Sequence, residues 1–537
     1  MSTPKEIEIK LGLSPASLPR LKKIPLIRAN ERSAKRTTEV SVYFDTDKHE
    51  LHKKGLTLRV RRIGRRHIQT IKAMENSRLF ERDEWESEIA SAQPDLGLAR
   101  GTALEPFIRR KFRRQLKPMF ETRVERTAYP VTNGTGEIAL TVDRGKIDAG
   151  GRSAPLCEIE LELKRGNQAE LFNVARELME AVPARLEFKS KSQRGYELLD
   201  GERGASDQAV GVDLLAGTST RDGFKSIGRA CLRQIVGNQP AVLKGDPDGV
   251  HQMRVGLRRL RAALSLFADI LADSQTAAIK SELKWLGGEL ALARELEVLM
   301  KRVVAPLKKR HARWDGVPSL SEELAEKREA ALARAQDAVK SPRFQALTLE
   351  IAAWLETGVW TNPRDDLVRN RGDIPIEVSA AEQLSRRWKK IRKKGKAVLR
   401  LDAKRRHKLR IQTKKVRYAA EFFAGLFPGK RAAKRRKEFL PALESLQDAL
   451  GDLNDIVVHE ELIAAMGVRR RRASRKRVFA AGLLMGHEDA RIDAAMTAAI
   501  GAYADLAKVR RFWAQSADAY RGYVYLAPIW WWRPRSQ

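Results

Sequence analysis

Two alternating segments carry the residues best suited to metal chemistry. Near the N-terminus the chain reads Glu6-Ile-Glu-Ile-Lys10, and far downstream it reads Glu158-Ile-Glu-Leu-Glu-Leu-Lys164. Strict alternation is typical of a β-strand, with the charged residues on one face and the apolar residues on the other. An edge strand with a solvated charged face would show the same pattern. Two acidic strands side by side would repel each other unless a cation lies between them. Hard divalent cations bind carboxylate oxygens, and Mg²⁺ usually also binds substrate phosphates.

The elements that must position these carboxylates are further charged strands. Residues 56–61 and 68–72 alternate basic with apolar residues, and residues 82–88 are rich in acidic ones. A strand pair at 120–131 and 137–147 follows, joined by an Asn-Gly turn. Helices are expected at 104–116 and 171–182. Several strands carry charged residues at alternate positions. We therefore expect a mostly antiparallel barrel whose lumen is charged and whose apolar outer face is covered by helices.

These motifs, together with Tyr43-Phe-Asp-Thr46, Thr70-Ile-Lys72 and Ser190-Lys-Ser-Gln-Arg-Gly-Tyr196, resemble the CYTH family of triphosphate tunnel metalloenzymes. The resemblance covers nearly all of residues 1–200, with the motifs in the family's order. It implies an eight-stranded antiparallel β tunnel with flanking helices that cleaves triphosphates with Mg²⁺ or Mn²⁺.

The resemblance also implies roles for individual residues. The metal ligands would be Glu6, Glu8, Asp143, Glu158 and Glu160. The phosphates would be held by Lys10, Arg59, Arg61, Lys72, Arg126 and Lys191. Glu84, Glu86 and Arg194 are further candidates for substrate binding. Arg126 fits the family pattern better than its neighbour Arg123, and Glu162 is expected to be solvated at the tunnel rim.

Composition limits the class of protein. The 537 residues are enough for two or more domains, and the net charge of +35 points to polyanionic partners. The two cysteines, Cys157 and Cys231, indicate no disulfide framework and favour a reducing cytosol. No apolar run reaches the roughly 18–20 residues that span a bilayer, and no signal peptide is recognisable. We therefore expect a soluble cytoplasmic protein.

The second half of the chain predicts an all-helical domain at 218–525, after a linker at 201–217 rich in Gly, Ser and Asp. It contains a repeat, because the segment beginning His251-Gln-Met-Arg254 returns as His407-Lys-Leu-Arg410. The spacing places the basic residues of each segment along one side of a helix. The repeat predicts two similar helical bundles about a pseudo-twofold axis, whose basic stripes face each other or line one cleft.

The duplicated segments resemble the CHAD domain, a helical module associated with binding inorganic polyphosphate. The contacts implied for the polymer are His251, Arg254, Arg258, Arg261, His407, Arg410, Lys414 and Arg417. A solvated basic helix face is the alternative for each stripe. The basic run from Arg469 is expected to be an exposed helix face or connector. In the aromatic and basic tail at 526–537, Trp530–Trp532 would pack on the bundle or lie at a membrane surface.

The leading hypothesis is a metal-dependent inorganic triphosphatase whose helical domain binds polyphosphate. An adenylyl cyclase, an organic triphosphatase and a non-catalytic polyphosphate scaffold are the alternatives. A specific nucleic acid ligand is not expected, because neither half shows a recognition motif with aromatic stacking residues.

Overall fold

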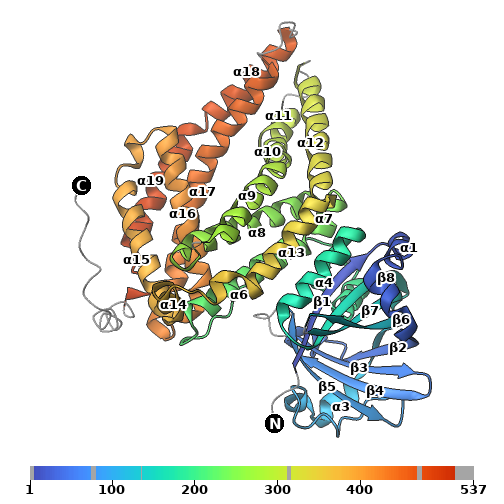
Figure 1. Ribbon diagram of the computed structural model, residues 1–537. Helices are drawn as coiled ribbons and strands as arrows, with labels where there is room; N and C mark the ends of the chain where they lie inside the picture. The colour runs from blue at the N-terminus through green and yellow to red at the C-terminus, as the bar shows by residue number, and fades with distance from the viewer. Residues whose placement is uncertain are drawn as a thin grey trace.

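The computed structural model describes residues 5–73, 80–134, 136–202, 204–271, 273–310, 316–467 and 475–514. A β barrel lies beside an elongated helical domain (Figure 1). Most of the basic run from Arg469 and all of Trp530–Trp532 lie outside the described residues. Among the described helices, none has the length and hydropathy needed to cross a membrane.

The barrel is closed and antiparallel, as the charged strands predicted. Its strands are β1 (Lys5–Leu13), β2 (Lys35–Asp45), β3 (Leu56–Ile63), β4 (Arg66–Ala73), β5 (Glu81–Ile89), β6 (Lys117–Asn133), β7 (Gly136–Ala149) and β8 (Arg152–Arg165). They are hydrogen-bonded in the order β5-β4-β3-β2-β6-β7-β8-β1, and β1 pairs again with β5 to close the ring of eight. A short ninth strand, β9 (Ala184–Glu187), adds to β1 outside the ring.

Alternation along β1 and β8 separates the two faces of the barrel wall. Ile9, Leu11, Ile159 and Leu161 are fully buried on the outer face, where helix α4 (Gln168–Ala181) packs against the wall. A capping box at Asn167 starts α4 by satisfying backbone N–H groups of its first turn. The acidic and basic side chains of the same strands therefore point into the lumen, as the sequence predicted.

Smaller helices surround the barrel. They are α1 (Leu18–Leu21), α2 (Pro25–Asn30), α3 (Arg110–Gln115) and α5 (Lys191–Asp200). The helix expected at 104–116 is a 3₁₀ turn followed by the short α3, because the backbone is non-helical at Ile108 and extended at Arg109.

Helix α5 is fixed at one end of the barrel. Ser190 and Gln193 form its capping box, and Gly201 ends it in the left-handed conformation. Gly195 allows a close approach to the Phe120 ring, since a Cβ atom there would lie 2.2 Å from a ring carbon. The Tyr196 hydroxyl donates a 2.8 Å hydrogen bond to the buried Asp45 carboxylate. These contacts set how far the first turn of α5 reaches into the barrel.

The helical domain consists of two runs of helices. The first contains α6 (Thr220–Gly237), α7 (Gln239–Leu243), α8 (Pro247–Leu266), α9 (Ser274–Glu289), α10 (Ala291–Leu299), α11 (Ala305–Arg310), α12 (Gly316–Lys340) and α13 (Pro342–Thr357). The second contains α14 (Asp366–Asp373), α15 (Ile376–Gly395), α16 (Ala403–Phe422), α17 (Lys430–Gly467), α18 (Arg475–Asp489) and α19 (Ile492–Lys508). The two basic repeats are α8 and α16, and these helices contact each other.

Contacts join the two domains. Helix α4 and strand β9 of the barrel pack against α13, and Arg176 forms a two-pronged ion pair with Glu350. In the segment between α5 and α6, Asp207 pairs with Lys189 of the barrel at 3.0 Å and hydrogen-bonds to Asn238 of the helical domain. The expected linker is therefore tied to both domains.

Candidate functional site

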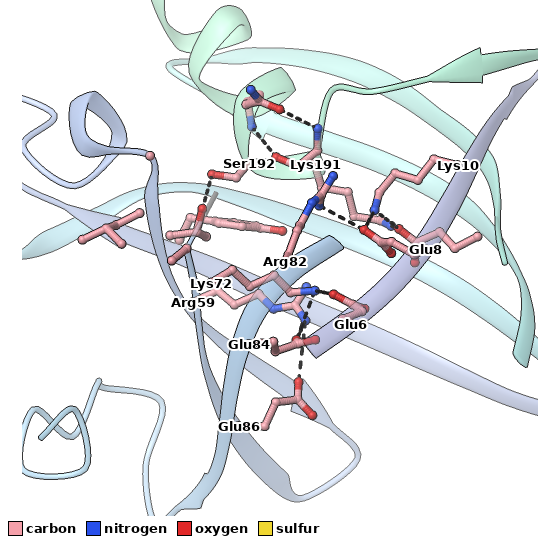
Figure 2. A pocket seen from close by; sticks show the side chains of 18 of the residues that line it. Glu6, Glu8, Lys10, Arg59, Lys72, Arg82, Glu84, Glu86, Lys191 and Ser192 are labelled. Carbon is pink, nitrogen blue, oxygen red and sulfur yellow. Dashed lines mark hydrogen bonds and ion pairs between the residues drawn. The ribbon is translucent and has the colours of Figure 1, made fainter. Parts of the chain in front are cut away.

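The barrel lumen is a charged cavity of about 620 Å³. Most of the predicted site residues line it: Glu6, Glu8, Lys10, Arg59, Arg61, Lys72, Glu84, Glu86, Arg126, Glu160 and Lys191. Figure 2 shows Glu6, Glu8 and Lys10 entering from β1 and Lys191 from α5. The remaining three, Asp143, Glu158 and Arg194, are not in the lining: Asp143 and Glu158 contact the lining residue Lys191, and Arg194 contacts Glu158.

Three carboxylates converge inside the barrel, at the edge of the lumen lining. Asp143 and Glu158 face each other across the β7–β8 pairing, both are fully buried, and Glu160 is two residues further along β8. One oxygen of each lies within 4.8 Å of the others. The Lys191 ammonium lies among them, at 2.7 Å from Asp143, 2.5 Å from Glu158 and 3.0 Å from Glu160. We call Asp143, Glu158 and Glu160 the carboxylate triad.

Basic groups keep Glu158 and Glu160 ionised. Burial alone would raise the pKa of Glu160, but Lys191, Lys10 and Arg126 outweigh it and hold that pKa well below its usual value. The pKa of Glu158 is lowered in the same way by Arg194 and Lys191 against its burial. Glu158 and Glu160 are therefore ionised at neutral pH.

The triad is suited to a divalent cation. All its donors are carboxylate oxygens, which Mg²⁺ and Mn²⁺ prefer. Glu158 Oε1 is buried and lies 2.5 Å from the Lys191 ammonium, which is the cation that faces it among the described residues. The donor set fits a metal without identifying which one.

The other two predicted metal ligands are arranged differently. Glu6 pairs with Lys72 at 2.7 Å, and Glu8 pairs with Lys10 and, at 3.0 Å, with Arg82. Neither belongs to the triad, although Lys10 also reaches Glu160 at 3.2 Å. Of the five predicted metal ligands, three thus form one cluster, and Glu6 and Glu8 are paired with basic residues, with Lys10 linking Glu8 to the triad.

Arginines line the wall formed by β3. Arg59 lies 3.9 Å from Glu84 and 3.8 Å from Glu86, and Arg61 pairs with Glu86 at 2.9 Å. The Nε atoms of Arg59 and Arg61 are buried and have no hydrogen-bond partner among the described residues. Unsatisfied guanidinium donors in a cavity favour binding of an anion with several oxygens, such as a phosphate chain.

Sequence reasoning missed several residues in and around this site, of which three are charged or polar partners of the predicted ones. Arg82 binds Glu8, Glu39 lies 3.4 Å from Arg61, and Tyr43 lines the cavity. Arg82 shares a strand face with Glu84, so the alternation already quoted could have revealed it. Glu162, expected at the rim, does line the cavity and pairs with Lys164.

A second cavity, of about 920 Å³, lies in the helical domain. Its lining includes seven of the eight predicted residues: His251, Arg254, Arg258, His407, Arg410, Lys414 and Arg417. Both basic repeats therefore line one cleft. Arg261 is exposed and is not part of the lining.

Like charges are crowded in this cleft. Burial and then Arg410 and Arg258 lower the pKa of Lys414 to about 7. Burial, followed by Arg294 and Arg258, lowers the pKa of His251 to about 4, so it is neutral at pH 7. The Nε atoms of Arg258 and Arg410 are buried without a hydrogen-bond partner among the described residues. A bound polyanion would relieve the repulsion and accept these hydrogen bonds.

Comparison with known proteins divides the chain as the structure does, into an N-terminal barrel and a C-terminal helical domain. Residues 4–196 match the CYTH domain and residues 226–464 match the CHAD domain. An inorganic triphosphatase from Haemophilus influenzae is 32% identical over 200 residues, covering 36% of this chain and 54% of that protein. The chain thus spans about half the length of this curated relative.

Two solved structures resemble the separate halves. The CHAD domain from the plant Ricinus communis is 29% identical, with a TM-score of 0.48, covering 57% of this chain and 98% of that one. The HpAC1 protein from Hippeastrum, described as having a dominant triphosphatase activity, is 19% identical, with a TM-score of 0.29. That match covers 36% of this chain and 95% of the Hippeastrum chain.

Proposed function

The chain belongs to the proteins that join a CYTH domain to a CHAD domain, and on this premise we propose that it hydrolyses inorganic triphosphate to diphosphate and phosphate. The observation that carries the proposal is the carboxylate triad opposite unsatisfied arginine donors in one enclosed lumen. The matched inorganic triphosphatase from Haemophilus influenzae supports the choice of substrate. A cytoplasmic location stays a prediction.

Each group of lumen residues has a distinct task. Arg59 and Arg61 line the cavity and bind phosphoryl oxygens with their guanidinium groups. Lys72, from the adjoining strand, adds positive charge on the same wall. These cations orient the chain and stabilise the charge that develops during phosphoryl transfer, which is the main task of a protein in such a reaction.

The triad would hold Mg²⁺ or Mn²⁺. A divalent ion bound there supplies charge neutralisation for the phosphates and can lower the pKa of a bound water. Lys191 and Arg126 hold Asp143 and Glu160 in place through ion pairs of 2.6–3.0 Å. These two basic residues also lower the pKa of Glu160 and so keep it ionised, which is the form that binds a cation.

The helical cleft is proposed to bind inorganic polyphosphate. Its support is the convergence of two basic repeats on one cavity, with depressed Lys414 and His251 pKa values. Arg254→Gln and Arg410→Gln should each weaken polyphosphate binding about tenfold, since a buried charged donor is lost. Lys408→Gln is the matched control, because Lys408 is exposed on the same helix outside the cleft. If all three variants bind polyphosphate with wild-type affinity, the basic stripes on α8 and α16 are solvated helix faces and not a binding site.

Phosphate release from tripolyphosphate with Mg²⁺ or Mn²⁺ tests the catalytic proposal. Glu160→Gln and Arg59→Ala should each lower kcat/KM by about a hundredfold or more. Arg66→Ala is the control, because Arg66 lies at the exposed start of β4 and pairs with Glu88 outside the lumen. Retained activity in both lumen variants would contradict the assignment.

ATP and thiamine triphosphate belong in the same assay. They separate an inorganic triphosphatase from an organic triphosphatase, and formation of cyclic AMP from ATP would reveal an adenylyl cyclase. If none of the triphosphates is processed with any metal tested, the barrel serves only as a scaffold.

A further inference from the structure

A short basic loop lies at one mouth of the tunnel. The residues His52, Lys53 and Lys54 form a 3₁₀ turn between β2 and β3, and all three line the same cavity as the catalytic candidates. Lys53 and Lys54 are exposed to solvent. Within the described part of the chain, no carboxylate forms an ion pair with either lysine. We call His52–Lys54 the mouth loop.

The mouth loop differs from the lumen in its charge balance. Lys72, Arg61 and Lys191 each pair with one or more carboxylates. An anion entering the lumen therefore meets cations that are already partly neutralised. At the mouth the lysine charges are uncompensated by the described residues, so an anion meets their full, though solvent-screened, attraction.

The position of the mouth loop is fixed by the buried Asp45 carboxylate. Asp45 accepts backbone hydrogen bonds from Thr46 at 2.7 Å, Leu51 at 3.0 Å and His52 at 3.0 Å. Gly55 then ends the turn with a φ of 71°, a left-handed conformation that favours glycine. A turn held in this way presents its side chains at a set place before substrate arrives.

The same carboxylate couples the mouth loop to α5. Asp45 also accepts the Tyr196 hydroxyl hydrogen bond, and the His52 ring stacks on Tyr196 with ring centroids 3.9 Å apart. Thr57, just past the loop, lies 3.2 Å from the Ser192 hydroxyl of α5. The lysines of the mouth loop are thereby held in register with Lys191, which reaches the triad from the same helix.

We propose that the mouth loop is an outer phosphate subsite that selects linear polyphosphates longer than three phosphates. The inference rests on the proposed triphosphatase function. Three phosphoryl groups are held by the paired cations of the lumen, and the next group of a longer chain lies against Lys53 and Lys54. Each added phosphoryl group brings another negative charge. A longer chain is therefore attracted more strongly to Lys53 and Lys54 at the mouth.

The test compares substrates in one double variant. Lys53→Ala/Lys54→Ala should lower the ratio of kcat/KM for linear tetraphosphate to kcat/KM for tripolyphosphate by about three- to tenfold, from two exposed ion pairs. The change should fall on KM. Lys22→Ala/Lys23→Ala is the matched control, because these adjacent lysines are also exposed but lie outside the cavity. The control should keep the wild-type ratio.

Two further arms make the outcome decisive. The ratio of kcat/KM for ATP to that for tripolyphosphate should not fall in the variant, since an ATP nucleoside at the mouth carries no phosphate charge. An equal loss for ATP and tetraphosphate would overturn the proposal in favour of a general effect on substrate entry. If the wild type hydrolyses nothing, the proposed function fails by itself. The subsite is then judged by calorimetric affinity for tetraphosphate, and equal affinities in wild type and variant overturn it.

Discussion

The ammonium of Lys191 lies 2.5 Å from Glu158 Oε1, where three carboxylates of two neighbouring strands converge. Lys191 is almost fully buried, and burial alone would lower its pKa. Asp143, Glu158 and Glu160 reverse that effect and raise it, so the side chain is charged throughout the neutral range. A protein cation thus balances the charge of the carboxylates that are suited to a metal.

Replacing Lys191 by methionine should expose the cation requirement of the triad. Removing one partner from a buried ion pair costs about 3–5 kcal/mol, so the free energy of unfolding should fall in metal-free buffer. Added Mg²⁺ should then raise the Tm more in Lys191→Met than in the wild type, because the metal replaces the lost charge. Lys146→Met is the control, since Lys146 is half exposed and lies outside the lumen lining. Equal Mg²⁺ shifts in all three proteins would show that the ion does not replace the charge of Lys191 at the triad.

Gly195→Ala should displace α5 from the barrel. The added methyl group would meet the Phe120 ring at 2.2–2.5 Å, a distance that nonbonded carbons do not tolerate. Overpacking of this kind costs about 1–3 kcal/mol. Because Lys191 is on the same helix, kcat should fall together with the Tm. Gly486→Ala is the control, because a Cβ atom there meets nothing within 4 Å. An unchanged kcat in Gly195→Ala would show that the position of α5 does not affect catalysis.

Tyr196→Phe should loosen the same helix more gently. It removes a hydrogen bond from a hydroxyl to a buried carboxylate, worth about 1.5–3 kcal/mol. Asp45 keeps its three backbone donors, so the loop should remain folded. Chemical denaturation measures the loss of stability. A loss near zero would mean that solvent replaces the Tyr196 hydroxyl.

Polyphosphate binding to the helical cleft should weaken as the pH rises through neutrality. Lys414 has a pKa of about 7 and is surrounded by Arg410, Arg258, Asp455 and Arg254. A bound polyanion favours the protonated form of the Lys414 amine. When the pH is above about 7, polyphosphate binding is therefore accompanied by uptake of a proton. Affinity should fall about three- to tenfold from about pH 6.5 to about pH 8.5.

Lys414→Arg should abolish most of this pH dependence, since the guanidinium stays charged over the whole range. Lys408→Arg, on the exposed side of the same helix, should retain it. Titration calorimetry in buffers of different ionisation enthalpy would count the protons taken up. Identical pH profiles for wild type and Lys414→Arg would assign the dependence to another group.

Alternation was enough to predict the closed barrel and its charged lumen, because a period of two assigns every residue of a strand to a face. It could not predict which carboxylates meet. That Asp143 lies opposite Glu158 is a property of the β7–β8 register, and it leaves Glu6 and Glu8 paired with basic residues instead. Register depends on turns and packing that one strand does not contain.

Helical periodicity had a similar limit. Arg258 is seven residues after His251 and returns to nearly the same side of α8, whereas Arg261, ten residues on, is rotated about 80° away. The structure places Arg258 in the cleft and leaves Arg261 exposed. Its counterpart Arg417 nevertheless lines the cleft and hydrogen-bonds to Gln447. The second repeat therefore departs from the first in a way that sequence symmetry could not show.

The pairing of β1 with β5, β8 and β9 has a consequence for biosynthesis. Strand β1 is synthesised before all three of its neighbours, and it finds two of them only after the chain has grown to residue 165 and then to 187. Until then its hydrogen-bonding edges have no native partner, and joining the ends of the sheet is a slow, long-range event. Nascent chains stalled before residue 165 should consequently depend on chaperones, and those extended past α5 should not.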